Sequence, residues 1–175
     1  MIKGILFDLD GVLWDSTESK IKFFQNILAE NGYKSRPKSE VRKVLHMTMW
    51  DAIKFLTKEK SEKRIKEVWL SGHEAEKKYP VELVKLPRGE NKIIEILSKR
   101  YKLAIVTSAI REGVETFFKL SGFGKHFSAV VSFEDYKKPK PDPEPLLIAM
   151  ERLRVKPDET VYVGDSPTDI VAGKR

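Results

Sequence analysis

The chain has 175 residues, of which 41% are hydrophobic and 34% charged, and its formal net charge at pH 7 is +7. This length suits one domain, or a domain with an inserted subdomain. The chain contains no cysteine, which excludes disulfides and thiolate metal sites, and no apolar run is long enough to cross a membrane. The N-terminus passes directly into a strand pattern without a secretory signal, so we expect a cytoplasmic protein.

The excess positive charge is concentrated in one segment. Residues 16–85 hold 16 Lys and Arg against 10 Asp and Glu, which accounts for +6 of the net +7. Such a segment either attracts an anionic substrate or nucleic acid, or is a lysine-rich helical surface that faces water. The charge alone leaves both interpretations open.

The first predicted element is a buried strand that ends in two carboxylates. Residues 5–7 are apolar, Asp8 and Asp10 follow with one residue between them, and Gly11 comes next. Open α/β sheets bind their ligands where strands end. Two neighbouring carboxylates repel each other, and a shared metal ion or different protonation states would relieve that cost. This strand end is therefore the first candidate for a chemical site.

Residues 16–84 lack strand patterns and carry helical ones. Four helical stretches are predicted from apolar residues on one face: Ile21, Phe24, Ile27 and Leu28; then Val41, Val44 and Leu45; then Ala52, Ile53 and Leu56; then Ile65, Val68, Trp69 and Gly72. The last stretch is predicted to end near Tyr79-Pro80. Together they predict a small antiparallel helical bundle.

Strand and helix patterns alternate over residues 85–175. Strands are predicted at 103–106, 129–131 and 160–163, and helical patterns lie before and after each of them. This alternation predicts an α/β fold with a Rossmann-like, doubly wound parallel sheet. We expect residues 1–15 and 85–175 to form this core domain, with residues 16–84 inserted after the first strand.

Four polar motifs each follow the end of a predicted strand. They are Asp8-Leu9-Asp10-Gly11, Thr107-Ser108, Lys138-Pro139-Lys140-Pro141-Asp142-Pro143 and Gly164-Asp165-Ser166-Pro167-Thr168-Asp169. The carboxyl ends of parallel strands lie at one edge of the sheet, so carboxylates, a hydroxyl and a cation are expected to converge there. A calcium loop does not fit the first motif, because the third acidic position and the distant glutamate are misplaced.

With these four motifs in order and at compatible spacing, the chain resembles the haloacid dehalogenase superfamily of phosphatases with an inserted helical cap. Phosphoglycolate phosphatases and β-phosphoglucomutases are nearby branches. The resemblance covers essentially the whole chain and implies a Mg²⁺-dependent enzyme that hydrolyses a small phosphomonoester metabolite. Relatives continue past the position of Arg175 with at least one strand and a helix, so we expect the last part of the usual core to be missing.

The resemblance gives each acidic residue of the motifs a role. Asp8 matches the nucleophile that forms an aspartyl-phosphate, and Asp10 matches the general acid/base. Asp165 matches the ligand that completes a Mg²⁺ site with the Asp8 carboxylate and the Asp10 backbone carbonyl. Asp169 is expected either to bind the metal, directly or through water, or to cap the helix near Thr168.

The same resemblance predicts the groups that hold the phosphoryl group. Thr107 matches the hydroxyl donor, and the backbone N–H groups of Ser108 and Ala109 would donate to the developing charge. The alternative for Ser108 is a helix cap.

The lysine that offsets the charge of Asp8 and of the phosphoryl group matches Lys138. We favour this residue because the pattern Lys-Pro-x-Pro-Asp-Pro begins there. Lys137 and Lys140 are close enough in sequence for an assignment by spacing to slip.

Substrate choice is expected to depend on the inserted cap, where the family carries a loop that reaches over the catalytic face. Residues 45–50 match that loop, and His46 stands where relatives commonly have glycine. His46 and Thr48 are candidate substrate contacts, with packing between helices as the alternative. Trp14 stands where smaller residues are common, and we expect it to form a wall of the pocket.

Two other functions stay open. A phosphomutase similar to β-phosphoglucomutase would use the same catalytic residues, and a non-catalytic regulatory protein would use the basic segment to hold an anionic partner. Dehalogenase chemistry is not expected, because those relatives need no second acid at the position of Asp10. The expected partner is a small phosphorylated metabolite, not a membrane or nucleic acid.

Overall fold

The computed structural model describes residues 1–75, 79–87 and 89–175, and it divides into two compact units. Met1–Asp15 and Lys85–Arg175 form an α/β unit, and Ser16–Val84 form a helical unit. The chain thus leaves the α/β unit after its first strand and returns to it later. No helix in the described part of the chain is both long and apolar enough to cross a membrane.

The α/β unit is built on four strands in the order β3-β2-β1-β4, all pairing in parallel. The strands are β1 (Gly4–Phe7), β2 (Lys102–Val106), β3 (Ala129–Val131) and β4 (Thr160–Val163). Phe7 of β1 is in register with Ile105 of β2 and Val163 of β4, so the three carboxyl ends are level. The predicted parallel α/β sheet is confirmed, and β1, which is buried along its length, lies inside it.

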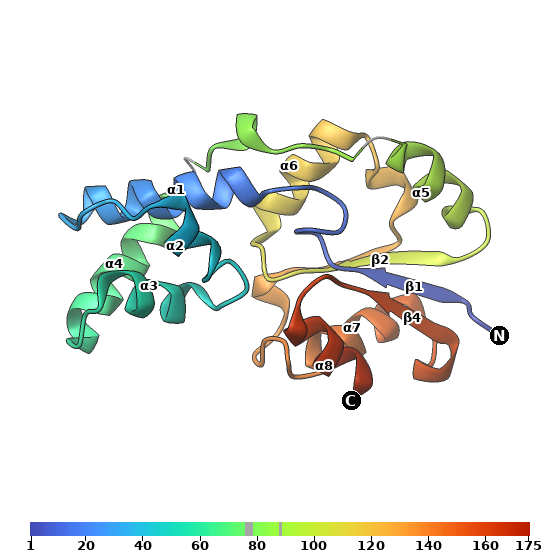
Figure 1. Cartoon of the computed structure of the whole chain (residues 1–175). Helices are drawn as coiled ribbons and strands as arrows, with labels where there is room; N and C mark the ends of the chain where they lie inside the picture. The colour runs from blue at the N-terminus through green and yellow to red at the C-terminus, as the bar shows by residue number, and fades with distance from the viewer. Residues whose placement is uncertain (76–78, 88) are drawn as a thin grey trace. The chain divides into compact units, whose positions relative to one another are not determined.

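Helices cover both faces of this sheet, with α5 and α6 on one face and α7 and α8 on the other (Figure 1). Their bounds are α5 Glu90–Ser98, α6 Arg111–Ser121, α7 Glu144–Leu153 and α8 Pro167–Lys174, with short 3₁₀ turns η3 Gly124–His126, η4 Phe133–Asp135 and η5 Pro157–Glu159. On the α7 face, Leu6 and Ala104 of the sheet pack with Leu146 and Ala149. Burying a side chain the size of leucine contributes roughly 1.5–3 kcal/mol, so this packing holds α7 against β1 and β2.

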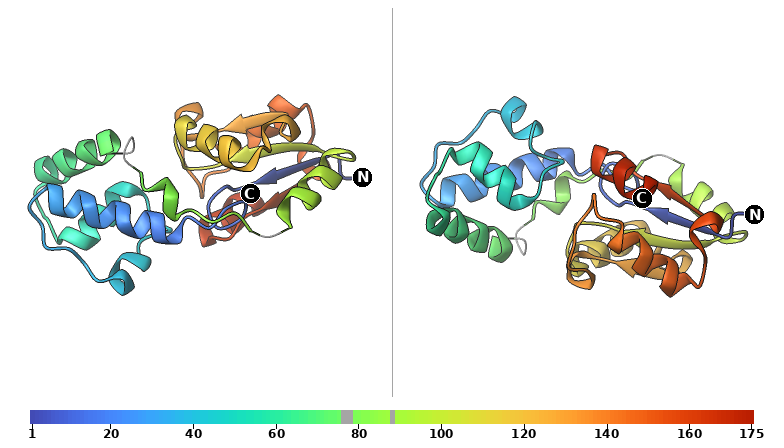
Figure 2. Two further views of the ribbon diagram at one scale, coloured as in Figure 1. Left: turned by 90° about the horizontal axis from the view of Figure 1, so that it is seen from above. Right: turned by 90° about the horizontal axis from the view of Figure 1, so that it is seen from below.

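The helical unit consists of helices α1 (Thr17–Glu30), α2 (Lys38–Arg42), α3 (Met49–Thr57) and α4 (Glu62–Ala75) and the 3₁₀ turn η2 (Val81–Leu83). α1 and α4 lie side by side (Figure 2). Ile27 of α1 and Val68 of α4 belong to one apolar cluster of this unit. α1, α3 and α4 contain the apolar residues of the first, third and fourth predicted stretches, whereas α2 ends at Arg42 and contains only Val41 of the second. The predicted end of the last helix falls partly on residues 76–78, which lie outside the described residues.

Candidate active site

The turn after β1 requires a glycine because another chain segment approaches it closely. Gly11 has a φ of +77°, and a Cβ built on it would lie 2.1 Å from Oδ2 of Asp165. The turn that follows Asp8 and Asp10 therefore lies directly against the loop after β4. Two of the predicted motifs meet here through a backbone that has no room for a side chain.

We expect Gly11→Ala to weaken metal binding as well as stability. Alanine at a positive φ costs about 1–2 kcal/mol by itself, and here its methyl group must also displace the Asp165 carboxylate. Gly122→Ala is the matched control, because Gly122 has a φ of +73° and open space around it. Thermal melting and a Mg²⁺ titration of activity on both variants separate the two effects. An equal Mg²⁺ requirement in both would contradict the role given to the Asp165 contact.

The centre of the site is a buried ion-pair cluster around Asp8. Its Oδ1 atom lies 3.1 Å from Nζ of Lys140, and the same Nζ lies 2.7 Å from Oδ1 of Asp169. The Lys140 side chain is only 5% exposed, and Asp8 and Asp169 are also buried. Asp8 follows β1, Lys140 precedes α7 and Asp169 lies in α8, so three separate segments meet at the carboxyl edge of the sheet.

The expected partner of Asp8, Lys138, is corrected to Lys140 by this geometry. The pattern Lys-Pro-x-Pro occurs twice in overlapping registers, once from Lys138 and once from Lys140. Glu144 accepts hydrogen bonds from the backbone N–H groups of Lys137 and Lys138, at 2.8 and 3.2 Å. These bonds hold that part of the loop at the surface, where Lys138 is exposed, and the second register reaches Asp8 instead.

Burial and charge act against each other in this cluster. Burial raises the pKa of Asp8 to about 6, although Lys140 opposes the rise. Burial disfavours the charged form of Lys140, but the carboxylates of Asp8 and Asp169 outweigh this effect and raise its pKa. Burial also raises the pKa of Asp169, but Lys140 and several hydrogen bonds reverse that effect and lower it overall. Lys140 and Asp169 are thus a stable ion pair, and Asp8 is the carboxyl whose charge is most costly.

Asp169 both caps helix α8 and orients Lys140. Its Oδ2 accepts the backbone N–H of Ser166 at 3.0 Å, in a capping box at the start of α8. Its Oδ1 accepts from Lys140 and from the hydroxyl of Tyr162, which is 2.7 Å away. Of the two roles expected for Asp169, the helix cap is present. Its role as a metal ligand stays a prediction.

The described residues also offer a set of oxygen ligands suited to a hard cation. One carboxylate oxygen each from Asp8, Asp165 and Asp169 lies within 4.8 Å of the other two. Three ionised carboxylates and one lysine leave a formal charge of −2, which a divalent cation would balance. Mg²⁺ prefers oxygen ligands and keeps several waters, so this donor set fits it. The Asp10 carbonyl stays a prediction as a further ligand.

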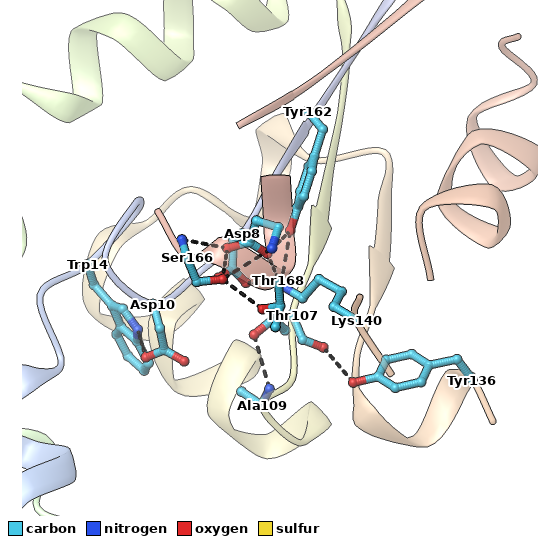
Figure 3. Close-up of polar contacts among 11 residues, drawn as sticks. Asp8, Asp10, Trp14, Thr107, Ala109, Tyr136, Lys140, Tyr162, Ser166 and Thr168 are labelled. Carbon is cyan, nitrogen blue, oxygen red and sulfur yellow. Dashed lines mark hydrogen bonds and ion pairs between the residues drawn. The ribbon is translucent and has the colours of Figure 1, made fainter. Parts of the chain in front are cut away.

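The residues after β2 are arranged around the Thr107 hydroxyl. Thr107 is buried, and its Oγ1 accepts the backbone N–H of Ala109 at 3.0 Å (Figure 3). The Tyr136 hydroxyl donates to the Thr107 carbonyl at 3.4 Å. The Ala109 N–H, predicted to donate to a phosphoryl group, is therefore directed to Thr107 in this structure. Ser108 is exposed, and α6 begins after Ile110, so Ser108 is not its N-cap.

Asp10 lies apart from the lysine cluster and pairs with Trp14. The indole Nε1–H of Trp14 donates to Oδ1 of Asp10 at 2.8 Å (Figure 3). Trp14 is 4% exposed, and its place in the wall of a substrate pocket stays a prediction. The sequence singled out the unusual residue but not the hydrogen bond.

In the helical unit, the structure gives Thr48 a local role. Its Oγ1 accepts the backbone N–H of Asp51 at 3.2 Å and donates to the Asp51 carboxylate at 2.8 Å, which caps α3. His46 is exposed. Substrate contacts from these two residues stay predictions.

Sequence reasoning missed Tyr162, and it named Lys140 only as a neighbour of the favoured Lys138. Tyr162 donates to Asp169, and its hydroxyl lies 3.0 Å from Nζ of Lys140. Burial, followed by the charges of Asp8 and Asp169, raises the pKa of Tyr162, so the phenol stays protonated as a donor. The sequence offers only a weak indication of this role. Tyr162 lies between Val161 and Val163 in β4, and because those two side chains are exposed, the Tyr162 side chain faces inward.

Comparisons with known proteins show which family the chain belongs to. The sequence profile of the haloacid dehalogenase-like hydrolases matches residues 5–175. The chain therefore belongs to that family, and within it the chain is a phosphatase.

Individual relatives cover nearly the whole chain. It is 32% identical over 173 residues to pyrophosphatase PpaX of Bacillus velezensis and 33% identical over 175 residues to PpaX of Halalkalibacterium halodurans, covering 99% of this chain and 79% of each relative. A structure from Lactobacillus plantarum, assigned as a phosphoglycolate phosphatase, matches with a TM-score of 0.88 at 26% identity, covering 99% of this chain and 83% of that one. A structure from Thermotoga maritima, assigned as a β-phosphoglucomutase, matches with a TM-score of 0.73 at 27% identity, covering 99% and 81%.

Proposed function

We propose that this phosphatase hydrolyses a small phosphomonoester metabolite with Mg²⁺, through an aspartyl-phosphate on Asp8. The observation that carries the proposal is the buried Asp8 carboxylate at the end of β1, 3.1 Å from Lys140 and close to two further carboxylates. A carboxylate that is costly to ionise and sits beside a cation is suited to attack phosphorus and to be regenerated afterwards.

In the first step, an oxygen of Asp8 attacks phosphorus, and the bond from phosphorus to the leaving oxygen breaks. Asp10 donates a proton to that oxygen, so an alcohol departs and an acyl phosphate remains. In the second step, Asp10 takes a proton from water, the water oxygen attacks phosphorus, and the Asp8 carboxylate leaves. The products are inorganic phosphate and the starting enzyme.

The surrounding residues hold charge and geometry during both steps. Lys140 takes the role first expected of Lys138: it offsets the charge of Asp8 and of the phosphoryl oxygens. Thr107 donates its hydroxyl to a phosphoryl oxygen. Mg²⁺, held by Asp8, Asp165 and Asp169, would neutralise the repulsion between the nucleophile and the phosphate.

Removal of the metal is expected to abolish activity and to lower stability. With EDTA present, the site keeps its formal charge of −2, and the repulsion among its carboxylates is not compensated. Adding Mg²⁺ should restore hydrolysis of p-nitrophenyl phosphate and raise the melting temperature, because the ion binds the folded chain only. Calorimetric melting with and without Mg²⁺ measures binding independently of turnover. Full activity in EDTA would contradict the metal requirement.

Pyrophosphate is the second candidate substrate, because the relatives at 32–33% identity are named pyrophosphatases. Pyrophosphate hydrolysis requires the same attack on phosphorus, with a phosphate as the leaving group. The helical unit, which carries His46 and Thr48, is the proposed source of selectivity. Release of phosphate from pyrophosphate and from a panel of phosphorylated metabolites, compared by kcat/KM, decides between the two. Isomerisation of a sugar phosphate without net phosphate release would favour the phosphomutase alternative.

A further inference from the structure

Asp10 makes a hydrogen bond that the two steps above do not use. Its Oδ1 atom accepts the indole Nε1–H of Trp14 at 2.8 Å, and Figure 3 shows this pair to one side of the Asp8–Lys140 cluster. Asp10 is partly exposed, whereas Trp14 is 4% exposed. A donor fixed in the protein interior thus contacts one oxygen of a partly exposed carboxylate.

The backbone fixes Trp14 relative to Asp10. The N–H of Gly11 donates to the Trp14 carbonyl at 2.9 Å, and the N–H of Trp14 donates to the Leu9 carbonyl at 3.2 Å. The same Leu9 carbonyl accepts the N–H of Leu13 at 2.9 Å. Asp10 and Trp14 therefore face each other across a tight, closed turn.

Aromatic packing fixes the indole ring itself. Phe117 of α6 meets Trp14 edge to face, with ring centroids 5.7 Å apart and planes at 80°. Phe117 is fully buried and packs in turn on Phe123, with centroids 5.8 Å apart. A buried indole N–H needs an acceptor, and the Asp10 carboxylate supplies it.

We propose that Trp14 is a positioning residue for Asp10, on the basis of the proposed function in which Asp10 is the acid/base. An indole N–H donates and never accepts, so it binds Oδ1 whether Asp10 is ionised or protonated. The transferable proton of Asp10 then resides on Oδ2. Trp14 thus determines which oxygen exchanges protons with the leaving group and with water, and in which direction that oxygen points.

The leaving group of the substrate provides a test that separates positioning from structure. Departure of an alkoxide needs a proton, whereas p-nitrophenolate departs with little help from an acid, and kcat/KM reports the step in which it leaves. Trp14→Phe keeps an aromatic ring on the side of Phe117 and removes the N–H donor together with part of the indole ring, a loss of volume that affects both substrates equally. We expect its kcat/KM to fall about 10-fold for an alkyl phosphate such as glycerol 2-phosphate and to stay within about 2-fold for p-nitrophenyl phosphate.

Control variants show which conclusion follows from each result. Trp69→Phe, in helix α4, should change neither substrate, and Asp10→Asn should show the same selective loss as Trp14→Phe in stronger form. An equal fall for both substrates in Trp14→Phe, with Asp10→Asn still selective, would overturn the role of Trp14 and leave the proposed function intact. Activity retained by Asp8→Asn would overturn the proposed function, and this inference with it.

A second measurement needs no turnover. The chain has three tryptophans, so a ¹⁵N-indole NMR spectrum contains three side-chain N–H signals. The Trp50→Phe and Trp69→Phe spectra identify the signals of Trp50 and Trp69, and the remaining signal is that of Trp14. In Asp10→Ala we expect that signal to move upfield, as a hydrogen-bonded proton does when it loses its acceptor, while the signals of Trp50 and Trp69 stay in place. A Trp14 signal that does not move in Asp10→Ala would overturn the inference even if Trp14→Phe folds poorly.

Discussion

Asp8→Asn should abolish phosphatase activity, lowering kcat/KM by at least about 10³-fold, because a carboxamide is not a nucleophile for phosphorus. The substitution preserves the size and shape of the side chain, so folding should persist. Phosphate release from p-nitrophenyl phosphate with Mg²⁺ present measures the loss. Asp158→Asn is the matched control, because Asp158 is exposed in η5 at the amino end of β4, opposite the end that carries the site, and should keep normal turnover.

The same substitution should make the metal-free chain more stable at neutral pH. Burial raises the pKa of Asp8 to about 6, so at pH 7 the folded state holds a carboxylate in a place that disfavours it. Each pKa unit corresponds to about 1.4 kcal/mol, and the rise from 3.8 to about 6 amounts to about 3 kcal/mol. Asparagine removes this cost and leaves Lys140 and Asp169 as a balanced pair.

The pH dependence of that gain has a definite sign. Between pH 4 and pH 6 the folded state binds a proton on Asp8 that the unfolded chain does not, so wild-type stability falls as the pH rises through this window. The advantage of Asp8→Asn should therefore be largest at pH 7 and shrink toward pH 4. Urea unfolding in EDTA at both pH values measures it. A gain that is the same at pH 4 and pH 7 would show that the titration of Asp8 is not its cause.

The fold was predictable because its signals are local and repeated. Buried parallel strands such as β1 and β2 read as short apolar runs, and helical patterns between strands imply parallel connections. The same logic predicted that Asp8, Thr107 and Asp165 would meet, since each follows the carboxyl end of a strand. Parallel register then carries three segments distant in sequence to one edge.

Some details of the site could not be predicted, because the sequence is compatible with more than one arrangement of the same residues. From its position in the sequence, Asp169 could equally be a helix cap or a metal ligand. Its hydrogen bonds to Ser166 and Lys140 show how its two oxygens are used. The orientation of the Trp14 indole depends on its packing with Phe117, which is 103 positions away in sequence. The Lys-Pro-x-Pro pattern occurs in two registers, and composition cannot choose between them.

The two registers can be separated by a pair of matched substitutions, Lys140→Met and Lys138→Met. Methionine keeps the length of the apolar stem and removes the charge in both. We expect Lys140→Met to lower kcat at pH 7 by about 10²-fold or more, because Lys140 lies against Asp8 and would stabilise the transferring phosphoryl group. Lys138 is exposed, so Lys138→Met should stay within about 2-fold of wild type.

Lys140→Met should also change stability and pH dependence in a linked way. Loss of the Lys140 ammonium leaves Asp8 and Asp169 buried without their cation, and such a change typically lowers the free energy of unfolding by about 3–5 kcal/mol. Because Lys140 lowers the pKa of Asp8, its removal should move that pKa above 6, and the residual activity should then rise more steeply with pH than in wild type. If Lys138→Met lowered activity more than Lys140→Met, the catalytic lysine would be Lys138, in the register that begins there. A flat pH profile in Lys140→Met would contradict the electrostatic link between Lys140 and the nucleophile.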